Sequence, residues 1–470
     1  MTKRIVGFIA SKIFLAGSIC LMLTACGEAD VLPSEESPSS PAALEALPVT
    51  PSFQGEPAAL PQNGIPQQDN IPQGFALPSN TASQDELSSP QPDTARSELQ
   101  YSDSPDASPE ITLVMAGDIL LHTPVAESGL QEDGSYDFSA VFSHTWEEIS
   151  AADLALVNQE VILGGTELGI SGYPAFNAPY ELGDALAEAG FDVVLHATNH
   201  ALDKGAKGIT NCLNYWGNSH PDMEILGIHG SAEEQDELSI YEQDGIKIAI
   251  LNYTYGTNGI PLPQGMDYAV DLLTDPDRVA RDLQRAEELA DFTIVCPHWG
   301  TEYRLTQDAG QDSLARFFRE NGADLVLGTH PHVIEPVAWV TEEGILPCDL
   351  TETETEQGIS FMGSDLPEGM LVYYSLGNFV NWTSGTGEGV ANRMVGGLAK
   401  VTLGLDDSGA VSIKEYGIVP VICHVEEGRG GVTVYPYSDY TEELAEKNAI
   451  RLQDGNFSLE YCHTLIERVW

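Results

Sequence analysis

The stretch Ile111-Thr-Leu-Val-Met-Ala116 is a short apolar run that ends in the polar pair Gly117-Asp118. A run of this length, rich in strand-forming residues and closed by a turn signal, is typical of a buried β-strand. The same pattern returns at residues 154–157, 193–195, 246–253, 292–296, 325–327 and 371–375. Each of these runs predicts a further strand.

Helix-like segments separate the predicted strands. They span residues 180–189, 206–216, 277–289 and 313–321. Alternating strands and helices predict an α/β fold in which helices pack on a sheet layer. Ligands in such folds gather where strands end, because the loops there are free to present side chains.

Five of the predicted strands are followed closely by residues of a type that binds metal ions. These residues are Asp118, Glu160, Asn199, His298, His330 and His332. A single histidine in such a place is more often packed or solvated, but five strand ends sharing the property indicate a site. Two divalent cations about 3.5–4 Å apart need a bridging carboxylate and several terminal ligands. The set therefore predicts two divalent metal ions, and its imidazole and carboxylate ligands suit Zn, Mn or Fe.

The spacing His330-Pro-His332 bears on how two of these ligands are presented. In an extended segment, residues two apart face the same side, so both rings would point the same way. The intervening Pro331 would stiffen the segment.

Residues 1–26 have the pattern of an export signal. Basic residues precede an apolar run from 13 to 23, which is short for a membrane span, and the run leads into Leu23-Thr-Ala-Cys26. This ending resembles a bacterial lipobox, in which the cysteine is acylated, although an ordinary signal or an uncleaved anchor helix shares the earlier features. We expect a lipoprotein signal peptide, lipidation at Cys26, and a location outside the cytoplasm on the cell membrane of a bacterium.

Residues 27–109 differ in composition from the rest. They are rich in Pro, Ser, Gln and acidic residues, contain Arg96 as their one basic residue, and hold almost no aromatics. Such a stretch buries too little apolar area to offset its ordering entropy, so we expect a disordered tether. The domain is then expected at 110–422, with a C-terminal extension packed on it at 423–470.

The charge of the chain is strongly negative: 72 Asp and Glu stand against 20 Lys and Arg, a net charge of −52. Such a surface repels nucleic acid and anionic lipid headgroups, so no nucleic-acid partner is expected. An anionic substrate would need a local source of positive charge, which bound metal ions would supply. Solubility outside the cell accounts for the same acidity without any ligand.

The residues at the strand ends belong to longer motifs. These are Gly117-Asp-Ile-Leu-Leu-His122, Asn158-Gln-Glu160, Ala197-Thr-Asn-His-Ala-Leu-Asp-Lys-Gly205, His298-Trp-Gly-Thr-Glu302, Gly328-Thr-His-Pro-His-Val333 and Tyr374-Ser-Leu-Gly-Asn-Phe379. Together, in this order over residues 111–421, they resemble the CapA family of bacterial capsule and poly-γ-glutamate synthesis proteins. The resemblance implies a calcineurin-like metallophosphatase fold, a layered sheet sandwich flanked by helices.

The resemblance also implies roles for single residues. Asp118 and His332 would bind one metal, and Glu160 would bridge to the second. The remaining ligands of the second metal would be Asn199, His298 and His330. His200 would act as general acid toward the leaving group or orient the attacking water. Asp203 would orient His200 as its i,i+3 neighbour, or it would cap the following helix.

Other motif residues are left with several roles. Metallophosphatases of this class usually carry a histidine two residues after the first aspartate, whereas His122 lies four after Asp118. His122 is therefore a metal ligand, a support for the ligands or a pocket residue. Glu302 could bind metal, hydrogen-bond a ligand imidazole or recognise a substrate amine. Trp299 and Asn378 are expected at the pocket, Asn378 as a residue that secures a loop. Residues that replace the usual family ones outside the proposed ligand set are Gln159, Thr198 and Thr329.

Three functions fit these features. The first is a metal-dependent hydrolase of the phosphoesterase type, acting at the cell surface on a phosphoester or an anionic polymer. The second is a part in capsule or poly-γ-glutamate synthesis, alongside capsule-assembly proteins. The third is a non-catalytic scaffold or transport component of a polymer assembly complex. The ligand set favours an enzyme, and the lack of a P-loop and of a Gly-x-Ser-x-Gly motif disfavours ATP-driven ligation and serine hydrolysis.

Overall fold

A computed structural model describes residues 109–470 except 349, 351–353, 356–357, 362–365 and 428–430. The predicted signal peptide, Cys26 and all but the last residue of the predicted tether lie outside these residues. None of the described helices has the length and apolar character needed to cross a membrane. The five cysteines in the described part, Cys212, Cys296, Cys348, Cys423 and Cys462, are free thiols.

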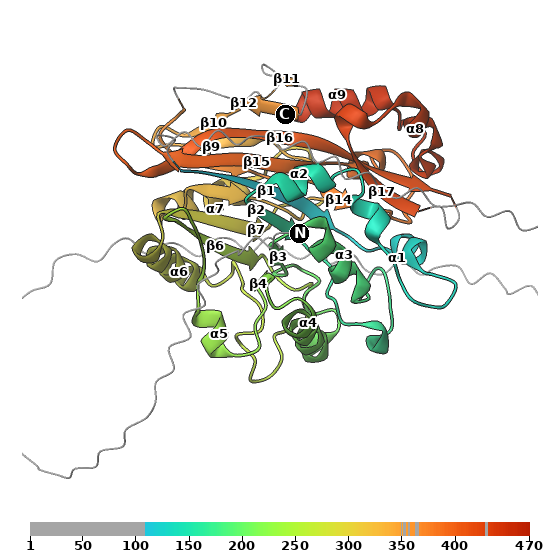
Figure 1. Ribbon diagram of the computed structural model, residues 1–470, viewed down its shortest axis with the longest axis horizontal. Helices are drawn as coiled ribbons and strands as arrows, with labels where there is room; N and C mark the ends of the chain where they lie inside the picture. The colour runs from blue at the N-terminus through green and yellow to red at the C-terminus, as the bar shows by residue number, and fades with distance from the viewer. Residues whose placement is uncertain (1–108, 349, 351–353, 356–357, 362–365, 428–430) are drawn as a thin grey trace, which may run out of the picture. The chain divides into compact units, whose positions relative to one another are not determined.

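The larger of the two sheets has ten strands among the described residues (Figure 1). Its order is β11 (Glu354–Thr355), β12 (Gly358–Phe361), β16 (Val411–Glu426), β15 (Val395–Leu405), β1 (Glu110–Ile119), β2 (Leu154–Asn158), β3 (Val193–Leu195) and β4 (Glu224–Leu226). In addition, β14 (Asn378–Val380) pairs with β1, and β17 (Gly431–Pro436) pairs with β16. The strands β1 to β4 run parallel to one another, whereas β15 and β16 are antiparallel.

The smaller sheet has seven strands in the described part of the chain. Its order is β10 (Ile345–Pro347), β9 (Val337–Val340), β13 (Met370–Tyr373), β8 (Leu325–Leu327), β7 (Phe292–His298), β6 (Ile246–Thr254) and β5 (Ser239–Gln243). The central strands β6, β7, β8 and β13 are parallel. Each sheet therefore contains a block of parallel strands whose carboxyl ends can present ligands.

The longer helices cover these sheets, and shorter ones fill the connections. Their bounds are α1 (Thr123–Gly129), α2 (Trp146–Ala151), α3 (Glu181–Ala189), α4 (Gly205–Ser219), α5 (Ala232–Asp236), α6 (Pro276–Leu289), α7 (Ala309–Glu320), α8 (Glu442–Lys447) and α9 (Leu459–Val469). The predicted α/β class, a layered sheet sandwich flanked by helices, is confirmed. One helix begins earlier than the sequence predicted. Helix α7 starts at Ala309 rather than at residue 313, because Asp308 and Gln311 form a capping box there.

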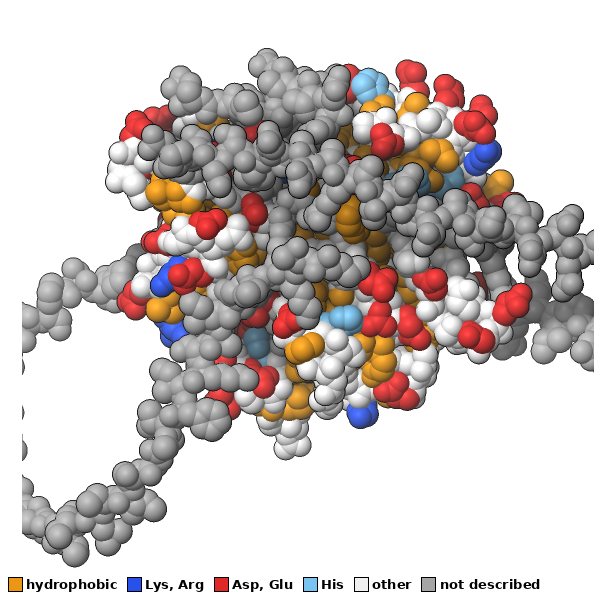
Figure 2. Space-filling model, viewed as in Figure 1, with side chains coloured by type: hydrophobic (Ala, Val, Ile, Leu, Met, Phe, Trp, Pro, Cys, Tyr) orange, Lys and Arg blue, Asp and Glu red, His pale blue; other side chains and the backbone are white. Residues whose placement is uncertain are grey.

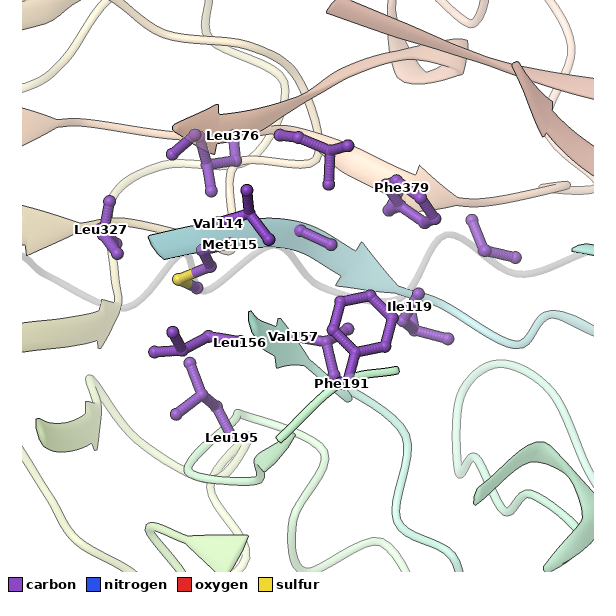
Figure 3. Close-up of a cluster of buried hydrophobic side chains, with 14 of the residues drawn as sticks. Val114, Met115, Ile119, Leu156, Val157, Phe191, Leu195, Leu327, Leu376 and Phe379 are labelled. Atoms are coloured by element: carbon purple, nitrogen blue, oxygen red, sulfur yellow. The ribbon is translucent and has the colours of Figure 1, made fainter. Parts of the chain in front are cut away.

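The main hydrophobic core lies around β1 (Figure 3). Val114 and Met115 of β1 pack with Leu156 of β2, and Leu327 from the other sheet belongs to the same cluster. A second cluster joins the seven-stranded sheet to α6 and α7 through residues such as Phe318. Strands β2 and β7 are buried along their whole length. Strands buried on both faces read as continuous apolar runs, which is why the sequence revealed them.

The C-terminal segment is continuous with the larger sheet. The boundary that we expected between residues 422 and 423 lies inside β16, and β17 then pairs back onto that strand. Helices α8 and α9 lie along the same side, at the top of Figure 1. The aromatic ring of Trp470 reaches β15, since a Cβ on Gly397 would lie 2.7 Å from it. The structure has no break at residue 422, because β16 continues through it. A division into domains at that point stays a prediction.

Candidate metal centre

Two glycines bring the start of the site together. A Cβ on Gly117 would lie 2.1 Å from the carbonyl oxygen of Gly377, so the two backbones approach more closely than any other residue would allow. Gly377 has φ 65°, a left-handed conformation that favours glycine. The amide of Asp118 donates to that same carbonyl over 3.0 Å. The Gly-Asp and Leu-Gly-Asn motifs thus place Asp118 beside Asn378 by backbone contact.

Three groups of side chains lie close enough together to hold a metal ion, with ligand atoms within 4.8 Å of one another in each group. The groups are Glu160 with His298 and His330, Asp118 with Glu160 and His332, and Glu302 with His330 and His332. Asn199 joins the first group, because its Oδ1 lies 3.0 Å from His298 Nε2. The structure therefore brings together all the metal ligands proposed from the sequence.

Buried atoms without partners show that this cluster suits a cation. Both carboxylate oxygens of Glu160 and Nδ1 of His330 are buried, and no described residue gives them a hydrogen bond. Leaving such an atom unpaired costs about 1–3 kcal/mol. A divalent cation ligated by these atoms would remove that cost. The mixture of imidazoles and carboxylates is a donor set that Zn, Mn and Fe accept.

The electrostatics of the cluster point the same way. Burial raises the pKa of Glu160 well above its ordinary value, although His332 partly opposes this. Burial, followed by the neighbouring imidazoles, lowers the pKa of His298 and of His330 well below the usual value. For His332 burial also acts downward, but the carboxylates of Glu160 and Asp118 outweigh it and raise the pKa to about 9. A bound cation would favour the ionised carboxylate and the neutral imidazoles that ligation requires.

Polar residues to which the sequence analysis assigned no role hold the ligands in place. Asn158 donates from Nδ2 to Asp118 Oδ1 over 2.8 Å and lies 3.5 Å from His298 Nδ1. The hydroxyl of Thr329 lies 3.0 Å from the same His298 nitrogen. Asn158 is the last residue of β2 and directly follows the apolar run 154–157, so its position at a strand end was the available signal. Nothing in the spacing of Thr329 marks it as a support for a histidine from another strand.

The His330-Pro-His332 segment is not extended, so the predicted backbone conformation is wrong. Both histidines nevertheless belong to one metal-competent group with Glu302. Both histidines have positive φ, 99° for His330 and 59° for His332. Positive φ is uncommon in residues other than glycine, and it persists where surrounding contacts impose it. Here the amide of His330 donates to Asp118 Oδ2 over 3.2 Å. Asn378 contacts His332 twice, with Oδ1 3.1 Å from Nδ1 and Nδ2 donating to the carbonyl oxygen over 3.1 Å.

His200 lies beside the cluster and has its own supports. Its Nδ1 is 2.7 Å from Asp203 Oδ2, and its Nε2 is 3.9 Å from Glu160 Oε1. Asp203 also accepts from the amide of Phe176 over 2.7 Å. Helix α4 starts with no side-chain cap, so the structure places Asp203 with His200 rather than at the helix end. Asn258, which the sequence did not indicate, contacts both Asn199 and His200.

The remaining motif residues differ in their contacts with the site. Glu302 is exposed and belongs to a metal-competent group, whereas His122 belongs to none. The ring of His122 packs against Phe176 at 5.1 Å, and burial, then His332 and Arg393, lowers its pKa to about 4. Our expectation that Trp299 lines the pocket is wrong. Trp299 is buried in the second core cluster and donates from its indole to the carbonyl oxygen of Tyr374.

Two tyrosines lie beside the buried histidines His330 and His332. The ring of Tyr255 lies 4.6 Å from that of His330, and the ring of Tyr303 lies 6.0 Å from that of His332. Both tyrosines are exposed. Figure 2 shows Asp and Glu side chains spread over the visible described surface, with few Lys or Arg among them. A Lys or Arg side chain near the site is therefore a candidate for binding an anion.

Comparison with protein families gives a match over most of the described chain. Residues 112–383 match the family described as "Bacterial capsule synthesis protein PGA_cap". The "PGA biosynthesis protein CapA" of Bacillus subtilis (strain 168) is 28% identical over 201 residues, which are 42% of this chain and 45% of that one. The "Capsule biosynthesis protein CapA" of Bacillus anthracis is 26% identical over 290 residues, 58% of this chain and 61% of that one. The chain thus covers less than two thirds of either relative.

Solved structures give weaker similarities. A putative 5'-nucleotidase from Staphylococcus aureus has a TM-score of 0.40 at 12% identity, covering 66% of this chain and 54% of that one. The NAD nucleotidase of Haemophilus influenzae has a TM-score of 0.37 at 14% identity, covering 77% and 60%. Similarity at this level says nothing about activity.

Proposed function

The chain belongs to the family of bacterial capsule synthesis proteins described as PGA_cap, and on that premise we propose that it is a two-metal hydrolase of the cell surface. In this proposal it is anchored outside the cytoplasm by a lipid on Cys26. It works in capsule or poly-γ-glutamate synthesis, next to capsule-assembly proteins. Its substrate is a phosphoester or a related bond of an anionic polymer.

The observation that carries the proposal is the position of Glu160. This carboxylate belongs to two of the three metal-competent groups, one with His298 and His330 and one with Asp118 and His332. Its two oxygens are buried without a hydrogen-bond partner in the described part of the chain. A carboxylate shared between two ligand sets, with both oxygens free, is what a bridge between two cations requires.

The residues divide between the two metal positions. One position would be held by Asp118, Glu160 and His332. The other would be held by Glu160 together with Asn199, His298 and His330. Bound divalent cations would supply a Lewis acid that activates water and neutralises charge developing on the substrate oxygens. Supporting contacts from Asn158, Thr329 and Asn378 keep the ligand side chains oriented without that metal.

His200 is the residue that we assign to proton transfer. Asp203, with Oδ2 2.7 Å from Nδ1, fixes the orientation of the ring. The opposite nitrogen, Nε2, faces the metal centre at 3.9 Å from Glu160. From this position Nε2 can give a proton to a leaving oxygen. Phe176 packs edge-on against the ring at 4.6 Å and limits its movement.

The test compares the full chain, purified in detergent, with the variants Glu160→Gln and His200→Ala. Metal content is measured by mass spectrometry, and turnover is measured with bis-p-nitrophenyl phosphate. We expect two divalent ions per chain in the parent, fewer in Glu160→Gln, and an unchanged content but little turnover in His200→Ala. A parent that holds its metal and turns over no phosphoester would support the scaffold or transport alternative instead.

A further inference from the structure

Arg393 is a cation at the edge of the candidate metal centre that neither the motifs nor the proposed function uses. It lies in the short 3-10 helix Ala391–Met394, just before β15. The carbonyl oxygen of Arg393 accepts a hydrogen bond from Asn378 Nδ2 over 3.0 Å, and the same amide group donates to the carbonyl oxygen of His332. Asn378 therefore ties the backbone of Arg393 to the loop that carries two metal ligands.

The side chain of Arg393 is held against an aromatic ring of the same site. Its Cζ lies 3.7 Å from the centre of the Tyr303 ring, a cation–π contact. Tyr303 lies 6.0 Å, ring to ring, from His332. Burial is the main cause that lowers the pKa of His122, and the positive charge of Arg393 adds to it. Burial raises the pKa of Tyr303, and the charge of Arg393 partly opposes that rise. The guanidinium thus lies on the ring of Tyr303 and close enough to His122 to act on it electrostatically.

No carboxylate among the described residues pairs with this guanidinium. The ion pairs that arginine and lysine make in the described part of the chain involve Arg278, Arg285 and Lys447. The Nε of Arg393 is buried and has no hydrogen-bond partner there. In a chain with 72 acidic residues, an arginine kept half-buried and unpaired beside a cluster of ligands calls for an anion as its partner.

We propose that Arg393 binds an oxyanion of the substrate next to the metal centre and thereby sets the specificity for anionic substrates. The planar guanidinium presents parallel N–H donors that match two oxygens of a phosphoryl or carboxylate group. Stacking on Tyr303 fixes the plane of the fork before the substrate arrives, which reduces the entropy lost on binding. The inference rests on the proposed function for the reaction that follows, but anion binding itself is measured separately.

Binding is measured by calorimetry on the full chain in detergent, with inorganic phosphate and with tri-glutamate as separate probes. Each titration is run with Mn²⁺ and after metal removal, and bound metal is counted in the same samples. The variants are Arg393→Met, Arg393→Lys, Tyr303→Phe and Tyr303→Leu. Arg451→Met, which removes an exposed charge from another part of the chain, controls for the change in net charge.

A charge-assisted hydrogen bond lost from a binding site weakens affinity by about 10- to 100-fold. We expect that loss in Arg393→Met, a smaller one in Arg393→Lys and Tyr303→Leu, and none in Tyr303→Phe or Arg451→Met. Loss for phosphate identifies a phosphoryl group as the bound oxyanion, and loss for tri-glutamate alone identifies a carboxylate. Unchanged affinity for both probes in a folded, metal-loaded Arg393→Met overturns the inference. A parent without bound metal overturns the proposed function, while its metal-free titrations still decide on Arg393.

Discussion

The substitution Gly117→Ala tests whether the contact between two backbones builds the metal centre. The new Cβ would lie 2.1 Å from the carbonyl oxygen of Gly377 and 3.2 Å from that of Leu376. Both obstacles are main-chain atoms, so no side-chain rotation relieves the clash. The 3.0 Å hydrogen bond from Asp118 to Gly377 must lengthen as the strands part.

The magnitude follows from two losses. Overpacking a buried site costs about 1–3 kcal/mol, and the weakened hydrogen bond adds about 1 kcal/mol. A total of about 2–4 kcal/mol corresponds to a fall of about 3–5 °C in melting temperature for a domain of this size. Because Asp118 moves with Gly117, the affinity for divalent metal should fall as well.

The assay is thermal unfolding followed by circular dichroism, with metal content measured on the same samples. Gly455→Ala is the matched control, since a Cβ there meets no atom within 4 Å and its φ is not positive. The control should melt within about 1 °C of the parent, because surface substitutions usually change stability by less than about 0.5 kcal/mol. A Gly117→Ala protein that melts with the control and keeps its metal would refute the reasoning.

Three further predictions concern proton transfer, a buried carboxyl and the anchor. His200→Ala should lower turnover by about 10²- to 10⁴-fold, as loss of a general acid does, and should leave the metal content unchanged. Asp203→Asn, assayed beside it, should also lose turnover. Full activity in both variants would contradict the role of His200. Burial raises the pKa of Glu335 from 4.5 to about 8, so the folded state holds this proton more tightly than the unfolded state does. The stability of the parent therefore falls as pH rises between those two values. In denaturant titrations, Glu335→Gln should be more stable than the parent at pH 8 but not at pH 4. The same stability difference between variant and parent at both pH values would contradict this. Cys26→Ala should abolish labelling by a radioactive fatty acid and release the protein from the membrane fraction, and persistence of both signals would exclude lipidation at this residue.

That the proposed ligand residues lie together was predictable, because they follow strands that are visible in the sequence. Asp118 and His298 stand at the ends of apolar runs, and parallel strands deliver their carboxyl ends to one place. The pairing of the two sheets was not predictable in the same way. The pattern of hydrophobic residues along the chain indicates that a strand is buried, but it does not indicate which sheet the strand joins.

The residues that escaped prediction act across the fold rather than along the chain. Arg393 reaches Tyr303 from another element, and no local motif marks that contact. Asn258 meets His200 from a loop with positive φ, again without a sequence signal at His200. The prediction for Trp299 was wrong because it relied on the neighbouring residue in the sequence. Its place directly after His298 suggested the pocket, but successive residues of an extended chain face opposite sides, and Trp299 faces the core.

We propose that Glu160 bridges two divalent cations. The most direct measurement is the metal content of the full chain beside Glu160→Gln, which keeps the size of the side chain and removes its charge. We expect two ions per chain in the parent and a loss of at least one in the variant. The control Gln243→Glu on β5 should bind as many ions as the parent does. A parent with no bound divalent metal, or a Glu160→Gln protein that retains both ions, would contradict it.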